Sequence, residues 1–201
     1  MPHAADVLSN LAFALVGAVG VARLLSHHRV RFTPATEAGM WFIALGIIGT
    51  AIGSAWYHHN PTDATLVWDR LPLTLVFAGV LGAAISQRLG NDVGRCALAV
   101  LVPLGVASVV YWDLTGDLSL YLLVQIGGIA ALALLLALTR GRDDPIPWLW
   151  LVVCYVVAKI AETADQAIWD ATRGFVAGHM LKHLLAAVAC AAALWPLRMR
   201  R

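Results

Sequence analysis

The sequence MWFIALGIIGTAIGSAWY, at residues 40–57, contains no charged side chain. A helix needs about 20 consecutive, mostly apolar residues to cross the hydrocarbon core of a bilayer. The run therefore predicts a membrane-spanning helix over residues 38–58. Two polar side chains near its end, Ser54 and His58, belong either to a solvated helix boundary or to a functional site.

The composition of the whole chain also indicates that it lies in a lipid bilayer. Of its 201 residues, 60% are hydrophobic and 13% are charged. A soluble domain averages about 45–50% apolar and about 25% charged residues. Such a chain has too little polar surface to cover itself, so we expect it to be embedded in a bilayer. Its net charge of +2 is small and predicts no nucleic-acid partner.

The cysteines carry no signal for a disulfide or a thiolate metal site. Cys96, Cys154 and Cys190 are odd in number, lie within apolar segments and show no CxxC spacing. We interpret them as small core residues.

Seven segments are long and apolar enough to span a membrane, and the connections between them are short. They cover residues 8–26, 38–58, 65–86, 95–112, 118–138, 147–168 and 177–197. No stretch remains for a soluble domain. We therefore expect an all-α membrane protein with a single seven-helix transmembrane domain over residues 1–201. The glycines at 49–53 and 79–82 are typical of close helix packing through small residues.

The arginines of the connecting segments predict the orientation of this bundle. Cytoplasmic loops carry an excess of Lys and Arg. The second and fourth connections have neither residue, and the sixth has only Arg173. The other connections and the C-terminus hold Arg29, Arg31, Arg88, Arg140, Arg142, Arg198, Arg200 and Arg201. The N-terminus is thus predicted outside and the C-terminus in the cytoplasm, which requires an odd number of spans.

Polar side chains gather near one end of four predicted spans. An ionisable group at the centre of a span costs roughly 2.5–3.5 kcal/mol, so each one calls for a partner or a function. In the predicted topology these groups share one layer near the outer face. They are Ser54, His58, Asp69, Arg70, Lys159, Glu162, Asp165, Gln166, His179, Lys182 and His183.

The spacing of the histidines predicts a metal site. His179 and His183 are four residues apart, which places both on one face of a helix, about 6 Å apart along its axis. His58 would complete a set of three imidazoles, the pattern of catalytic zinc with one position open for water. Imidazole also suits other transition metals. The alternative is that these histidines only end their helices near the lipid head groups.

The motifs Ser54-x-x-x-His58, Asp69 and His179-x-x-x-His183 resemble those of the alkaline ceramidases and of the wider CREST superfamily of seven-helix membrane hydrolases. In ceramidases an Asp follows the first histidine by eleven residues, in a context like Asp-Glu-Leu-Pro. Residues 68–72 read WDRLP and hold Asp69 at the same offset. The resemblance covers the seven-helix layout and the order of the three motifs.

The chain also departs from that family. Arg70 stands where ceramidases usually have Glu, and Lys182 stands where they tend to have an aromatic residue. The stretch DVLSN at residues 6–10 keeps the Asp and Asn of the family's N-terminal calcium site but lacks its Trp and Glu. These residues therefore do not suffice to assign calcium, and the sequence does not decide whether an N-terminal calcium site exists.

The resemblance implies a zinc-dependent hydrolase that cleaves the amide bond of ceramide or a related N-acyl lipid. The products are a fatty acid and a sphingoid base or amine. It implies that His58, His179 and His183 hold zinc. Asp69 would move a proton from the attacking water to the leaving amine, and Ser54 would stabilise the negative oxygen.

Three further residues are expected around the ligands: Glu162, Asp165 and Arg70. Lys159 lies three residues before Glu162, which predicts an ion pair between them. The alternative is that Glu162 or Asp165 orients a ligand imidazole.

Two other functions use the same groups. A transporter or proton pathway also needs intramembrane carboxylates and histidines, and a receptor could retain a structural zinc ion. We expect a multi-pass integral membrane protein of the bacterial inner membrane, with the site toward the periplasmic leaflet. The sequence does not predict the oligomeric state.

Overall fold

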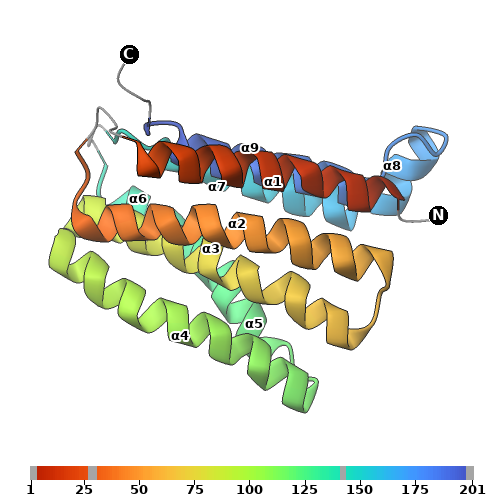
Figure 1. Ribbon diagram of the computed structural model, residues 1–201, viewed down its shortest axis with the longest axis horizontal. Coiled ribbons are helices and arrows are strands. Elements are labelled where there is room, and N and C mark those ends of the chain that lie inside the picture. Colours follow the sequence, from red (N-terminus) through yellow and green to blue (C-terminus); the bar gives the residue numbers. More distant parts are fainter. Residues whose placement is uncertain (1–3, 27–30, 141–143, 198–201) are drawn as a thin grey trace.

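Helices form all the regular structure in the described residues of the computed structural model, which are 4–26, 31–140 and 144–197. The helices are α1 (Ala4–Leu25), α2 (Pro34–His59), α3 (Asp63–Leu89), α4 (Asn91–Thr115), α5 (Ser119–Leu122), a π-helical turn η1 (Leu123–Gly127), α6 (Gly128–Leu138), α7 (Trp148–Thr163), α8 (Asp165–Ala171) and α9 (Gly178–Leu194). Figure 1 shows their arrangement. Arg29, Arg142, Arg198, Arg200 and Arg201, used above to predict orientation, lie outside the described residues.

Five helical segments are long and apolar enough to cross a membrane, as expected for a multi-pass membrane protein. They are α1, α2, α3, α4 and the continuous run Ser119–Leu138. The other two predicted spans are helical but shorter, with 16 residues in α7 and 17 in α9. The sixth segment, expected to be helical over residues 147–168, is interrupted at Ala164, where α7 gives way to α8.

The outward-facing surface of the bundle is apolar. Along α1, Leu8, Leu11, Leu15 and Val19 form an exposed stripe. Exposed leucines spaced in this way on a helix face are unfavourable in water but compatible with contact to lipid. Cys96 is also exposed, so its assignment to the core was wrong, whereas Cys154 and Cys190 are buried.

Glycine lets α2 and α3 pack with their backbones in contact. A β-carbon added at Gly39 would lie 2.7 Å from the carbonyl oxygen of Gly79, and one added at Gly79 would lie 2.5 Å from that of Gly39. Gly46, seven residues further along α2, would meet the carbonyl of Pro72 at 3.0 Å. The expected packing through small residues is confirmed at this interface.

The tightest contact of α2 and α3 occurs next to the polar residues. Pro72 has no N–H, so it cannot donate to the carbonyl of Trp68, one turn earlier in α3. A β-carbon at Gly53 would lie 1.9 Å from that carbonyl oxygen. The proline therefore leaves a carbonyl that the bare Gly53 backbone can approach, and this approach brings the adjacent Ser54 to the beginning of α3.

The helix ends that carry the polar residues lie at one end of the bundle. α1 packs against α2 and α9, α2 against α3, and α7 against α9. Figure 1 shows the end of α2, the beginnings of α1, α3 and α9, and the whole of α8 at the same end of the molecule. We call this the His58 end of the bundle.

Candidate metal centre

The three histidines of the predicted ligand set converge at the His58 end. His58 lies in the last turn of α2, and His179 and His183 lie in the first turns of α9. The Nε2 atoms of His58 and His179 are 3.1 Å apart, and one ring nitrogen from each of the three residues lies within 4.8 Å of the others. Tetrahedral zinc with bonds of 2.0–2.1 Å separates its ligand nitrogens by about 3.3–3.4 Å. Small ring movements therefore suffice for all three to bind one ion.

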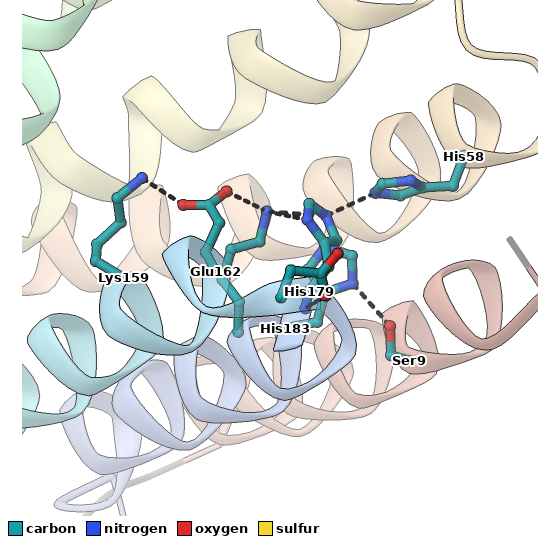
Figure 2. Close-up of polar contacts among 8 residues, drawn as sticks. Ser9, His58, Lys159, Glu162, His179 and His183 are labelled. Atoms are coloured by element: carbon teal, nitrogen blue, oxygen red, sulfur yellow. Dashed lines mark hydrogen bonds and ion pairs between the residues drawn. The ribbon is translucent and has the colours of Figure 1, made fainter. Parts of the chain in front are cut away.

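A contact with the first helix fixes the tautomer of His183. Figure 2 shows this contact, which joins Ser9 and His183. The Ser9 hydroxyl donates its single hydrogen to the carbonyl of Asp6 at 2.8 Å. It therefore accepts from the Nδ1–H of His183, which lies 2.7 Å away. The lone pair that remains on this ring is at Nε2, so the imidazole is presented as a neutral metal ligand. His183 is buried, with 3% of its surface exposed.

The break after α7 positions His179. Asp165 begins α8, and its Oδ1 accepts a hydrogen bond of 2.7 Å from the backbone N–H of His179, in the first turn of α9. Gly178 makes this possible, because a β-carbon there would lie 2.1 Å from the carbonyl oxygen of Ala161. Asp165 thus caps a helix and holds the backbone of a ligand residue, whereas the sequence suggested contact with an imidazole ring.

A chain of charges leads from the histidines into the bundle. Lys182 Nζ lies 2.9 Å from His179 Nε2 and donates to Glu162 Oε1 at 2.9 Å. The other oxygen of Glu162 accepts from Lys159, which confirms the predicted ion pair. Figure 2 shows the chain running from Lys159 through Glu162 to His179 and His58. Glu162 therefore reaches the histidines through Lys182 rather than directly.

Ser54 and Asp69 meet beside this cluster. The Ser54 side chain is a hydrogen-bond partner of the Asp69 carboxyl group. Both residues line the same cavity as His183. The three sequence motifs are thereby brought to one place from α2, α3 and α9.

Arg70 points away from the ligands into an aromatic pocket. Its guanidinium carbon lies 3.9 Å from the centre of the Trp112 ring and 5.2 Å from that of Tyr121. Stacking on aromatic faces stabilises a cation that is removed from water. Arg70 is therefore held next to Asp69 in the chain as a fixed positive charge, without contacting an imidazole.

A cavity of about 120 Å³ extends from the cluster into the bundle. At the histidine end it is lined by His183, Ser54, Asp69, Lys182, Glu162 and Lys159, and beyond them mainly by apolar side chains of α2, α3, α7 and α9. One water needs roughly 10–15 Å³ of such space, so the cavity has room for a run of several carbon atoms. The cavity therefore combines a polar end with a mainly apolar interior.

Comparison with protein-family models, with curated proteins and with solved structures finds no match for this chain. The arguments for function therefore rest on the residues themselves. Three imidazoles form a donor set that suits zinc and several other transition metals. Ser9, which holds His183, was not among the candidates. Its position near the beginning of the first span, at the depth of the other polar groups, is the signal that could have identified it.

Proposed function

We propose that the protein is a zinc-dependent intramembrane hydrolase that cleaves the amide bond of ceramide or a related N-acyl lipid. The observation that carries the proposal is the cluster of His58, His179 and His183, together with the fact that His183 lines the same cavity as the Ser54–Asp69 pair. Metal ligands, a carboxylate and a hydroxyl donor are the parts that hydrolysis of an amide needs.

Each of these residues has a separate role in the proposed reaction. His58, His179 and His183 would hold zinc, which would supply Lewis acidity for attack by water at neutral pH. Asp69 accepts the proton of the attacking water and passes it to the leaving nitrogen. Ser54 can donate its hydroxyl hydrogen to the oxygen of the scissile carbonyl as negative charge develops there.

The shape of the cavity suits a substrate with a long acyl chain. The carbonyl group would lie at the histidines and the chain would extend between α2, α3, α7 and α9. A second hollow, of about 230 Å³, lies between α3, α4 and the η1–α6 segment, and Phe77 lines both spaces. A lipid tail could therefore enter sideways from the bilayer past Phe77.

The proposed arrangement in the membrane has seven crossings, with the N-terminus outside and the C-terminus in the cytoplasm. In a bacterium this is the inner membrane, with the catalytic groups toward the periplasmic leaflet. Support comes from the one-sided distribution of arginine among the connections, with Arg31, Arg88 and Arg140 on the proposed cytoplasmic side and Arg173 alone opposite.

The test is release of fatty acid by the purified protein. Zinc-loaded protein in detergent is incubated with ceramides and other N-acyl lipids, and fatty acid is measured by mass spectrometry. Asp69→Asn should lower the rate by a factor of about 10²–10⁴, with unchanged zinc content. His59→Ala, which alters the exposed neighbour of His58, should leave the rate unchanged. Equal rates for the Asp69→Asn and unaltered proteins would refute the role given to this carboxylate.

A transporter predicts a different result. The carboxylates and amines that line the cavity are confined to the histidine end, and none follows Lys159 toward the start of α7. A proton path would need further groups along the cavity. Proton flux into liposomes that survives removal of zinc, without release of fatty acid, would favour transport over hydrolysis.

A further inference from the structure

Two polar side chains that line the cavity, Tyr155 and Gln125, take no part in the ion pairs and hydrogen bonds of the charged cluster described above. The hydroxyl oxygen of Tyr155 is fully enclosed and makes no hydrogen bond with any described residue. Gln125 lines the same cavity from the facing segment, and among the described residues its amide also has no side-chain hydrogen bond. A polar group removed from water without a partner is costly, so the enclosed Tyr155 hydroxyl calls for one.

The backbone is shaped to bring Gln125 to the cavity. It is the middle residue of η1, and π-helical turns within longer helices occur frequently at functional sites. The flanking Leu123 and Ile126 are exposed on the outward surface, whereas Gln125 reaches the cavity. This segment is otherwise strongly apolar, so its glutamine is turned inward, away from lipid.

Tyr155 is held on the opposite wall. Its ring meets the ring of Phe77 edge to face, with centres 5.7 Å apart and planes at 87°. On α7 it lies one turn from Lys159 and two turns from Glu162, so its backbone is roughly 10 Å further into the bundle than that of Glu162. At this depth, the Tyr155 residue would meet a bound acyl chain partway along its length.

We propose that Gln125 and Tyr155 form a subsite that recognises a hydroxyl group carried partway along the acyl chain of the lipid. Each of the two side chains offers a hydrogen-bond donor and an acceptor. A hydroxyl group also has both, whereas a keto group would use only donors. Both side chains are uncharged, and the nearest cation on α7, Lys159, is engaged with Glu162. The ligand group is thus neutral and polar. The inference rests on the proposed function in taking an acyl chain as the occupant.

The test measures binding and needs no hydrolysis. Stearic acid, its α-hydroxy derivative and a mid-chain hydroxy derivative are titrated into the purified protein in detergent, with binding followed by equilibrium dialysis. The mid-chain hydroxy acid should bind about tenfold more tightly than the other two, since two additional hydrogen bonds form. Equal affinity for the three acids, or no binding of any of them, would overturn the subsite.

Variants of Tyr155 and Gln125, compared with a control variant, test whether these two side chains bind the hydroxyl group. Tyr155→Phe and Gln125→Leu should each reduce the preference to about threefold or less, while affinity for stearic acid stays unchanged. Tyr111→Phe removes an exposed tyrosine hydroxyl that bonds Asp117, and it should keep the preference intact. A preference that persists in the Tyr155→Phe, Gln125→Leu double variant would contradict the assignment. Thermal unfolding of each variant checks that the fold is retained.

The subsite and the hydrolase can fail separately. Selective binding of the hydroxy acid by a protein that releases no fatty acid would support the subsite and refute the hydrolase. Release of fatty acid from plain and hydroxylated lipids at equal rates, with equal affinity for the free acids, would do the reverse.

Discussion

The proton on the His183 ring decides which of its nitrogens can bind a cation. The hydrogen bond from Nδ1–H to Ser9 leaves the lone pair on Nε2 and holds the ring against rotation. Hydrogen-bond partners of this kind raise metal affinity, and their loss typically lowers it 10- to 100-fold.

Ser9→Ala should therefore lower zinc affinity by about 10- to 100-fold, with only a small effect on thermal stability. Competition with a fluorescent zinc chelator measures the affinity. Ser26→Ala, near the other end of the first helix, removes a partly exposed serine that likewise bonds a backbone carbonyl, and it should leave zinc affinity unchanged. If Ser9→Ala and Ser26→Ala behave alike, the hydrogen bond to His183 has no part in metal binding.

Lys182 has the opposite influence on the site. Its ammonium nitrogen lies 2.9 Å from His179 Nε2, so it competes with a metal ion for the lone pair and repels the ion's charge. Lys182→Met should raise zinc affinity by about tenfold or more. Lys159→Met is the control, because Lys159 bonds only the far oxygen of Glu162. A lower zinc affinity in Lys182→Met would mean that the lysine supports the site instead.

At the scale of the elements, the site depends on the contact of α2 with the beginning of α3. Gly53→Ala would drive a methyl group to within 1.9 Å of the Trp68 carbonyl oxygen, so the helices must separate. We expect a loss of roughly 1–3 kcal/mol in stability, with weaker zinc binding because His58 moves with α2.

The control for this substitution is Gly128→Ala. A β-carbon at Gly128 would meet no atom within 4 Å, and alanine stabilises a helix relative to glycine by about 0.5–1 kcal/mol. Thermal unfolding in detergent and zinc affinity compare the two variants. A Gly53→Ala protein as stable as Gly128→Ala would show that α2 and α3 do not depend on this contact.

The sequence predicts long helices better than their interruptions. The span predicted at 38–58 corresponds to Pro34–His59, because hydropathy alone determines where a chain can enter lipid. The break at Ala164 depends on the packing of α9 against α7, which involves residues distant in the chain. The π-helical turn around Gln125 differs from an α-helix only in its backbone hydrogen-bond pattern, which the hydropathy of the sequence does not reveal.

The candidate site was predictable to a similar extent. The convergence of the three histidines with Ser54 and Asp69 was expected from spacing, topology and resemblance. The cap from Asp165, the aromatic pocket around Arg70 and the contact of Ser9 were not. Each of these depends on which way a side chain turns at a helix end, and periodicity does not determine that direction.

At the scale of the whole molecule, the proposed orientation can be tested with fusion proteins. Alkaline phosphatase fused after Pro61 should be active, since the connection between α2 and α3 is proposed to be periplasmic. Green fluorescent protein fused to the C-terminus should fluoresce, because it folds in the cytoplasm. Inactive phosphatase at Pro61, together with a dark C-terminal fusion, would reverse the orientation.

The metal content of the purified protein tests the central claim most directly. Elemental analysis of the zinc-reconstituted, desalted protein should give about one zinc ion per chain. His58→Ala and His183→Ala should each lose it, although these ligands come from different helices, while His59→Ala should retain it. An unaltered protein that holds no metal, or a His58→Ala protein that still holds one, would contradict a single ion shared by the histidines of α2 and α9.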